Sequence, residues 1–373
     1  MKIRAAVVRE KSGPFMIEEI ELNGPKDDEV LVRLVSSGIC RTDLEARDGN
    51  LNIPMPAVFG HEGAGVVEKA GSRVRKVEPG DHVVLGWNSC GECPDCRAGN
   101  DPYCASFFPL NLSGSRPDGT ATLSKSGQII HGSFFGQSSF ATYTSVSERN
   151  VVKVRADASL DVLGPMGCGI RTGAGAVINT LHPKAGSSIA VFGIGPVGMS
   201  AILAANLCGC DPVIAVDVHS ARLEASRSFG ATHVINSGET DPVAAIQEIT
   251  GNGADYTLEC SGIPKVLRQA VDCLVRGGPR SGVCGLLGVA KPGTEVSLDM
   301  DRLLNGRTVR GIVAGDSVQD VFIPKLIELY LQGHFPFDRM IKFYPFEEIN
   351  TAVHDMEKGT VLKPVLRFQK DRF

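Results

Sequence analysis

The chain has 373 residues, of which 43% are hydrophobic and 21% are charged, and its formal net charge is −4. This length allows two domains of ordinary size, and the composition is typical of a folded α/β protein and excludes a disordered chain. A slightly acidic chain gives no reason to expect nucleic acid or an anionic membrane as a partner. The first ten residues carry charges and no apolar segment, so we expect no secretion signal and a cytoplasmic protein. In that reducing compartment, eleven cysteines indicate metal binding or catalysis more than disulfides.

The first 150 residues have the pattern of a β-rich domain. Short alternating or apolar runs are separated by Gly, Pro, Asn and Asp, which is typical of strands joined by turns. The strands expected here cover residues 4–8, 15–22, 30–35, 64–68 and 82–85.

Four cysteines lie within fifteen residues in the spacing C-x2-C-x2-C-x7-C: Cys90, Cys93, Cys96 and Cys104. Four thiolates can close a tetrahedral shell around one Zn²⁺, which leaves no open position and predicts a structural site. An iron–sulfur cluster is the alternative, because C-x2-C-x2-C also begins a ferredoxin-type run. In that run the fourth cysteine comes after three residues and before proline, whereas here it comes after seven and before alanine, so zinc is favoured.

Residues 187–217 have the pattern of a dinucleotide-binding turn. An apolar run at 189–192 leads into G-x-G-x-x-G, then a small-residue helical pattern, then a second apolar run that ends on Asp217. The three glycines are Gly193, Gly195 and Gly198. In this order the helix N-terminus faces the phosphates and Asp217 accepts hydrogen bonds from the adenosine ribose.

Two other interpretations of this stretch compete. G-x-G-x-x-G is often an ordinary turn, and residues 185–210 carry no charge, which is long enough for a membrane span. Three glycines and a proline within the run argue against a span, and the position of Asp217 favours a nucleotide fold.

From about residue 170 the chain alternates between strand and helix patterns. The expected strands cover residues 188–192, 213–216, 233–235, 256–260, 282–287 and 308–313, and the helices between them include 221–229, 243–249 and 265–274. Six strands in this order predict a doubly wound parallel sheet. We expect the last sixty residues, with helices near 323–332 and 346–356, to return to the first domain, so that the nucleotide domain is inserted in a discontinuous one.

Three more candidate ligands are scattered through glycine-rich sequence: Cys40, His61 and Cys168. Each alone is more typical of a packed or solvated residue than of a ligand. Together, two thiolates, an imidazole and one open position would form a catalytic Cys2His zinc site.

The chain resembles the zinc-dependent medium-chain alcohol dehydrogenases over essentially its whole length. The resemblance is carried by GHEGAG at 60–65 with Gly71, by the four-cysteine spacing and by GIGPVG at 193–198. Within this family it is most similar to the benzyl (aryl) alcohol dehydrogenases, as in FFGQSSFATY and LGPMGCGIRTGAGA. The resemblance implies a GroES-like catalytic domain at 1–169 and 313–373 and an NAD-binding Rossmann domain at 170–312.

The family also implies roles for individual residues. Cys40, His61 and Cys168 would hold the catalytic zinc, with Glu62 nearby and Asp43 orienting His61. The residues implied to contact the cofactor are Gly193, Gly195, Val197, Gly198, Asp217, Arg222, Thr172, Arg41 and Lys363, of which Arg41 and Lys363 would neutralise the pyrophosphate. The single tryptophan, Trp87, falls where the family has an aromatic wall of the substrate pocket.

The implied reaction starts from a zinc-bound alkoxide, whose proton Thr42 takes, and ends with hydride transfer to the nicotinamide. In the best-studied members of the family a histidine passes the proton to solvent, and here that position is Glu45. Either this carboxylate is the terminal acceptor, or the proton leaves through water and Glu45 is a solvated surface residue.

The sequence therefore predicts NAD-dependent, reversible oxidation of primary aromatic or allylic alcohols to aldehydes, with two zinc ions per chain. A formaldehyde/glutathione-type or polyol dehydrogenase of the same superfamily is the nearest alternative. The alternative from another class of protein is a non-catalytic redox sensor that binds a nucleotide. A missing metal ligand or a missing Thr42 would indicate such a sensor, but the candidate ligands and Thr42 are all present. A homodimer or homotetramer is expected, and the sequence does not decide between the two.

Overall fold

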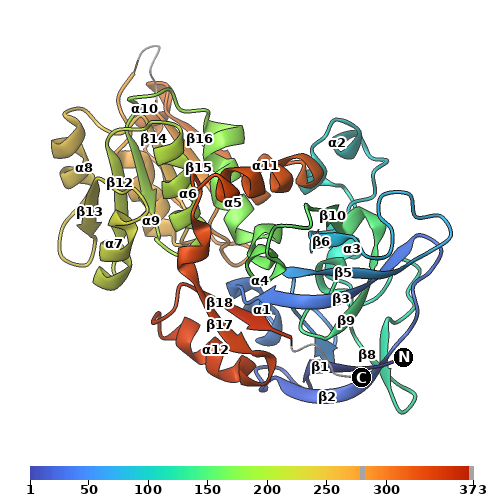
Figure 1. Cartoon of the computed structure of the whole chain (residues 1–373). Helices are drawn as coiled ribbons and strands as arrows, with labels where there is room; N and C mark the ends of the chain where they lie inside the picture. The colour runs from blue at the N-terminus through green and yellow to red at the C-terminus, as the bar shows by residue number, and fades with distance from the viewer. Residues whose placement is uncertain (278–281, 369–373) are drawn as a thin grey trace. The chain divides into compact units, whose positions relative to one another are not determined.

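Three β-sheets form the framework of the protein, in a computed structural model that describes residues 1–277 and 282–368 (Figure 1). The chain divides into two units. Unit 1 consists of Met1–Cys168, Val318–Glu328 and Asp338–Phe373, and unit 2 consists of Gly169–Ser317 and Leu329–Phe337. From the sequence, this second unit is expected at 170–312. In the structure its first segment runs from 169 to 317, and residues 329–337 also belong to it.

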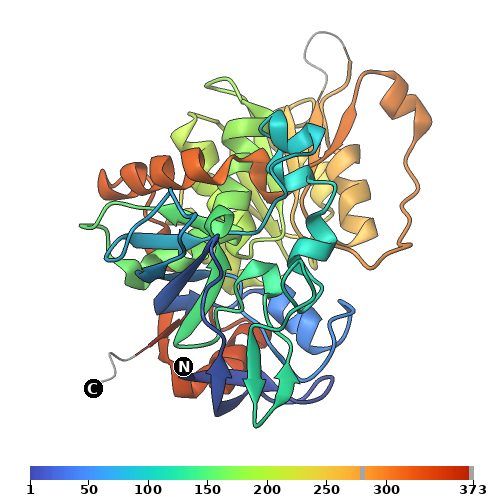
Figure 2. The same cartoon turned by 90° about the vertical axis from the view of Figure 1, so that its right-hand side faces the viewer.

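Unit 1 contains two sheets that are almost entirely antiparallel. One has the strand order β4-β1-β2-β7-β8, and the other has the order β10-β6-β5-β3-β18-β17, with β9 also paired to β3. Figure 2 shows the turquoise hairpin of β7 and β8 beside the dark-blue strand β2. The strands are β1 (Lys2–Val8), β2 (Met16–Leu22), β3 (Glu29–Gly38), β4 (Ala57–Val58), β5 (Gly63–Ala70), β6 (His82–Leu85), β7 (Leu123–Lys125), β8 (Gln128–Ile130), β9 (Tyr143–Ser147), β10 (Val151–Lys153), β17 (Ile341–Pro345) and β18 (Lys363–Arg367).

The helices of unit 1 are short except for the last two. They are α1 (Arg41–Arg47), α2 (Pro94–Arg97), α3 (Phe107–Asn111), α4 (Leu160–Leu163), α11 (Gln319–Leu331) and α12 (Ile349–Glu357). Helix α11 starts four residues before the predicted 323, because the Val318 carbonyl accepts from the Phe322 amide and so forms a first turn ahead of Pro324. Its last residues, from Leu329, belong to unit 2.

All five strands predicted in the first 150 residues are present. Of the last sixty residues, which were expected to return to the first domain, 318–328 and those from 338 lie in this unit and 329–337 in unit 2. The returning chain adds two strands: β18 pairs with β3, and β17 lies parallel to β18. The buried side chains of β1, β2 and α12 share one core with Phe59 and Phe140.

Unit 2 is built on a six-stranded parallel sheet with the order β13-β12-β11-β14-β15-β16. All six strands predicted from the sequence are present: β11 (Ile189–Phe192), β12 (Val213–Asp217), β13 (His233–Asn236), β14 (Tyr256–Glu259), β15 (Val283–Leu286) and β16 (Thr308–Gly311). The helices are α5 (Gly169–Gly175), α6 (Pro196–Leu207), α7 (Ser220–Arg227), α8 (Pro242–Thr250), α9 (Pro264–Asp272) and α10 (Met300–Leu304). The strand order reverses direction between β11 and β14, which is the switch point of a doubly wound Rossmann fold.

The uncharged run at 185–210 is split between strand and helix. Every residue of β11 is buried, as is typical of a parallel strand covered on both faces, and the glycine turn separates it from α6. Over the described residues, the helices are too short or too polar to cross a bilayer.

Candidate active site

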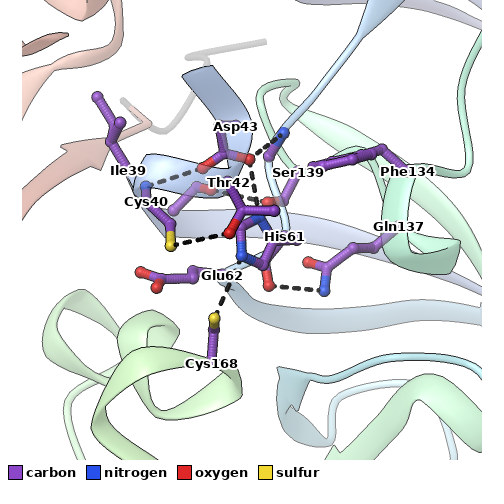
Figure 3. A network of polar contacts seen from close by, with 12 residues as sticks. Ile39, Cys40, Thr42, Asp43, His61, Glu62, Phe134, Gln137, Ser139 and Cys168 are labelled. Carbon is purple, nitrogen blue, oxygen red and sulfur yellow. Dashed lines mark hydrogen bonds and ion pairs between the residues drawn. The ribbon is translucent and has the colours of Figure 1, made fainter. Parts of the chain in front are cut away.

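Cys40, His61 and Cys168 come together in unit 1, although they are far apart in sequence (Figure 3). Cys40 precedes α1, His61 precedes β5, and Cys168 is the last residue of the unit before α5. Their ligand atoms and a carboxylate oxygen of Glu62 all lie within 4.8 Å of one another, and His61 Nε2 is 3.2 Å from Cys168 Sγ. Two sulfur atoms and one imidazole nitrogen converging on a point fit a Cys2His zinc site.

Asp43 fixes the geometry of this cluster. Its fully buried carboxylate accepts from His61 Nδ1 at 2.8 Å, from the Cys40 amide at 2.8 Å and from the Gly60 amide at 3.1 Å. Because a carboxylate only accepts, the imidazole proton lies on Nδ1, and Nε2 is left to face the two sulfur atoms. Burial alone would lower the pKa of His61, but the charge of Asp43 raises that pKa well above its usual value.

The two thiols differ in their ease of ionisation. The hydrogen bond from Cys168 lowers the pKa of Cys40 well below its usual value, and the same contact raises the pKa of Cys168. One thiolate is therefore already favoured before a metal binds, as a metal ligand requires.

Glu62 and Lys363 form a fully buried ion pair beside the cluster. Lys363 Nζ lies 2.9 and 2.8 Å from the two carboxylate oxygens and donates to the Ile39 carbonyl at 3.1 Å. A Cβ on Gly38 would come within 2.0 Å of the carboxylate, so a glycine is needed there. Burial raises the pKa of Glu62 to about 7 even though the Lys363 charge lowers it.

This pair engages a residue that the family resemblance assigns to the cofactor. The buried ammonium of Lys363 contacts Glu62 and the Ile39 carbonyl, and its role toward a pyrophosphate stays a prediction. A buried carboxylate costs several kcal/mol unless it is paired, and Lys363 is the cation that pairs with it.

The four cysteines at 90–104 also converge. Their sulfur atoms lie within 4.8 Å of one another, and backbone amides point at them: Glu92 and Cys93 donate to Cys90 Sγ at 3.4 and 3.3 Å. These two amides lower the pKa of Cys90 to about 6. Among residues 1–277 and 282–368, this group and the Cys40 cluster are the two sets of side chains that could hold a metal ion. A set of four sulfur atoms stabilised by amides fits a closed structural zinc site. We call residues 90–104 the cysteine lobe.

In unit 2 the glycine turn and Asp217 meet at the ends of adjacent parallel strands. Gly193 has φ +89°, and a Cβ on Gly198 would lie 2.1 Å from the Gly193 carbonyl, so both positions require glycine. A Cβ on Gly195 would meet nothing within 4 Å, which leaves space for a phosphate at the start of α6.

Asp217 is 7% exposed and is held by backbone amides. It accepts from Ile194 at 2.7 Å, from Val218 at 2.8 Å and from His219 at 2.9 Å, and Arg222 Nη1 lies 4.0 Å away. A carboxylate fixed in this way next to the glycine turn fits an adenosine ribose.

Thr42 and Glu45 follow Cys40 closely in the sequence. Thr42 Oγ1 is 3.7 Å from Cys40 Sγ. The Glu45 carboxylate accepts from Arg41 Nε at 2.8 Å and from Asn50 Nδ2 at 2.5 Å. Burial alone would raise the pKa of Glu45, but these two hydrogen bonds lower it below its usual value.

Trp87 and Thr172 lie in different units. Trp87 is 5% exposed and follows β6 in unit 1, whereas Thr172 is half-buried in α5 of unit 2. Their roles stay predictions.

Sequence reasoning missed a row of phenylalanines that starts at the candidate zinc ligand His61. Phe135 stacks on His61 with ring centroids 4.6 Å apart, Phe107 meets Phe135 edge-on at 6.0 Å, and Phe108 meets Phe107 edge-on at 5.9 Å. Phe108 is 72% exposed, so the row leads from the ligand to the surface. The two Phe-Phe pairs in the sequence were the available signal. We call Phe135, Phe107 and Phe108 the aromatic row.

Gln137 was missed as well. Its amide donates to the His61 carbonyl at 3.0 Å (Figure 3). It also donates to the Gly86 carbonyl at 2.8 Å and accepts from the Gly63 amide at 3.1 Å. This side chain ties His61 and the first residue of β5 to the residue before Trp87.

A parallel sheet with a glycine turn, joined to a β-rich unit with a Cys2His cluster, defines a zinc-dependent dehydrogenase. Comparison with known families agrees: residues 26–156 match the alcohol dehydrogenase GroES-like domain and residues 196–332 match the zinc-binding dehydrogenase domain. The chain belongs to the zinc-dependent medium-chain alcohol dehydrogenases, which confirms the resemblance read from its sequence.

Individual relatives cover nearly the whole chain. It is 44% identical over 368 residues to geraniol dehydrogenase of Castellaniella defragrans, covering 98% of this chain and 97% of that one. It is 35% identical to S-(hydroxymethyl)glutathione dehydrogenase of Paracoccus denitrificans, covering 99% and 100%. The crystal structure of benzyl alcohol dehydrogenase from Acinetobacter calcoaceticus superimposes with a TM-score of 0.95 at 46% identity, covering 99% and 100%.

Proposed function

We propose that this alcohol dehydrogenase oxidises primary aromatic or allylic alcohols to aldehydes, reversibly, with NAD+. The observation that carries the substrate class is the aromatic row, which begins with Phe135 stacked on the zinc ligand His61. A planar, conjugated substrate held near the ligands would contact ring faces and edges, and such contacts add about 0.5–1.5 kcal/mol beyond the burial of apolar area.

Two of the relatives support this class. Benzyl alcohol is aromatic and geraniol is allylic, and both carry a flat unsaturated group next to the carbinol carbon. The proteins named for these alcohols are 46% and 44% identical to this chain.

The catalytic roles follow from the geometry of the cluster. Cys40, His61 and Cys168 would hold one zinc ion, and the cysteine lobe would hold a second. When bound, the catalytic zinc supplies a Lewis acid that acidifies the alcohol, and the dinucleotide supplies the oxidant. Asp43 holds His61 in the tautomer that the site needs.

Thr42 is the first proton acceptor in this proposal, since its hydroxyl lies beside Cys40. Glu45 is a poor terminal acceptor, because both carboxylate oxygens already accept hydrogen bonds and its pKa is lowered. The proton therefore leaves from Thr42 through water.

The choice of NAD+ rests on Asp217. A ribose 2′-phosphate beside this buried carboxylate would bring like charges together and leave the carboxylate without its hydroxyl partners. We expect a higher kcat/KM with NAD+ than with NADP+; a preference for NADP+ would refute this role of Asp217.

Oxidation of the glutathione adduct of formaldehyde is the second candidate, because one relative at 35% identity is named for S-(hydroxymethyl)glutathione. The experiment that separates the two compares benzyl alcohol, geraniol, ethanol and the glutathione adduct of formaldehyde with NAD+. The proposal predicts the highest kcat/KM for benzyl alcohol or geraniol. The highest value for the glutathione adduct would favour the second candidate. Sedimentation of the same preparation would distinguish a dimer from a tetramer.

A further inference from the structure

The side chain of Asn111 joins the two chain segments that flank the cysteine lobe. Asn111 Oδ1 accepts from the Asn88 amide at 2.8 Å, and Asn111 Nδ2 donates to the Asn88 carbonyl at 2.9 Å. The same nitrogen donates to the Phe107 carbonyl at 2.8 Å. Asn111 is fully buried and Asn88 is 7% exposed, so these bonds are shielded from water.

The bonds between Asn111 and Asn88, here called the clasp, connect the lobe to two aromatic elements. Asn88 directly follows Trp87, and α3, which ends at Asn111, begins with Phe107 and Phe108 of the aromatic row. Inside the clasp, the Cys90 amide donates to Cys104 Sγ at 3.3 Å. The segment 88–111 is therefore a loop. The clasp joins its two ends, and the four cysteines hold its middle part together.

The clasp is costly to break. Each polar atom of a buried amide that loses its partner is desolvated without compensation. A displacement of the lobe must therefore either break the clasp or carry Asn88 and α3 along with it.

We propose that Asn111 is the positioning residue that couples the cysteine lobe to the aromatic row, so that the metal state of the lobe sets the preference for aromatic alcohols. The effect on substrate preference rests on the proposed function. The mechanical coupling does not, and it has its own measurement.

Trp87 provides that measurement, because it is the only tryptophan of the chain and lies next to Asn88. Asn111→Ser is a selective variant: a serine hydroxyl can still donate to the carbonyl four residues earlier, but it is too short to hold Asn88. We expect Trp87 emission to shift to longer wavelength and its quenching by acrylamide to increase, at unchanged zinc content. Unchanged emission and quenching would overturn the proposal.

Asn350 offers a matched control. Its side chain forms the same reciprocal pair with one backbone residue, accepting from the Phe15 amide at 3.0 Å and donating to the Phe15 carbonyl at 2.9 Å. Asn350→Ser should lower the melting temperature and leave Trp87 emission unchanged. If both variants shift the emission equally, the effect is general loosening and the coupling is refuted.

The lobe end of the coupling is tested by metal release. A thiol reagent that removes zinc from the lobe should shift Trp87 emission in the wild type, and should add little in Asn111→Ser, where the clasp is already open. Equal added shifts in both proteins would contradict the coupling. If Asn111→Ser does not fold, Asn111→Asp takes its place in the fluorescence and metal-release measurements. This isosteric change replaces the NH2 group, which donates to two carbonyls, with an oxygen that can only accept.

The substrate end is tested by comparing benzyl alcohol with ethanol. Asn111→Ser should lose about 3- to 10-fold in kcat/KM for benzyl alcohol, mainly through KM, and less than about twofold for ethanol. Equal losses on both alcohols would refute the effect on preference. A wild type that does not favour aromatic alcohols would refute the proposed function alone, since the fluorescence result is independent of it.

Discussion

The imidazole of His61 and the ring of Phe135 are stacked, with centroids 4.6 Å apart and planes inclined by 27°. One face of the proposed zinc ligand is thereby covered by the first ring of the aromatic row. Phe135 has a positive φ of +49°, a conformation that is uncommon for a bulky residue and is found where the surrounding structure imposes it. The contact therefore joins the proposed zinc ligand directly to the proposed substrate wall.

The first prediction concerns this ring. Phe135→Leu keeps most of the apolar volume and removes the ring face, so kcat/KM for benzyl alcohol should fall about 2- to 10-fold and that for ethanol should change less. Phe108→Leu, at the exposed end of the row, is the control and should have a smaller effect. Steady-state kinetics with both alcohols measures this, and equal losses in Phe135→Leu would show that the ring only supports the fold.

The second prediction concerns Glu45. Its two oxygens are engaged by Arg41 and Asn50, so Glu45→Gln should follow the wild-type kcat/KM profile within about twofold between about pH 6 and 10. Thr42→Ala should be slower throughout this range. A loss of about 10²–10⁴ in Glu45→Gln that shrinks as pH rises would identify Glu45 as the terminal proton acceptor instead.

The carboxylate of Glu45 should also make the stability of the protein depend on pH. The folded-state pKa of Glu45 is lowered, so its contribution is present above the unfolded-state pKa and is lost as pH falls through the lowered folded-state value. The melting temperatures of the wild type and Glu45→Gln should therefore differ at neutral pH and converge in acid. Curves that stay parallel at all pH values would exclude this linkage.

The third prediction concerns the buried pair of Glu62 and Lys363. Lys363→Met leaves a buried carboxylate without its cation and should destabilise unit 1 by about 3–5 kcal/mol. Adding Glu62→Gln should recover part of this loss, because the unpaired charge is then gone. Denaturant unfolding of the single and double variants measures both steps; a double variant no more stable than Lys363→Met would contradict the argument.

The fourth prediction separates the two metal sites. Cys93→Ser should lower the zinc content and the melting temperature, because the lobe depends on its metal for folding energy. Cys168→Ser should lose the other zinc while the far-ultraviolet circular dichroism spectrum stays close to that of the wild type. Two zinc ions per wild-type chain are expected by metal analysis; one zinc ion, or iron with visible absorbance, would overturn the assignment of the lobe.

Local patterns in the sequence were sufficient for much of this account. The cysteine lobe and the glycine turn are encoded in consecutive residues, and the central strands β11 and β12 are apolar runs on either side of that turn and its helix. Cys40, His61 and Cys168 were grouped from their residue types, their glycine-rich surroundings and the family resemblance, because nothing in their spacing shows that the fold brings them together.

What could not be predicted depends on contacts between distant residues. Lys363 lies 301 positions from Glu62, and no local pattern distinguishes it from an exposed lysine. Asn111 looks like a surface loop residue until the fold buries it against Asn88. Phe135 and Phe107 become neighbours only when α3 reaches the segment before β9.

The most direct test of the central claim is the rate of NADH formation from benzyl alcohol and NAD+ in the wild type and in Cys168→Ser. The wild type should turn over benzyl alcohol with NAD+, and Cys168→Ser, which lacks one ligand of the catalytic cluster, should lose at least about 100-fold in kcat/KM. A wild type without this activity, or a variant that retains it, would contradict the account.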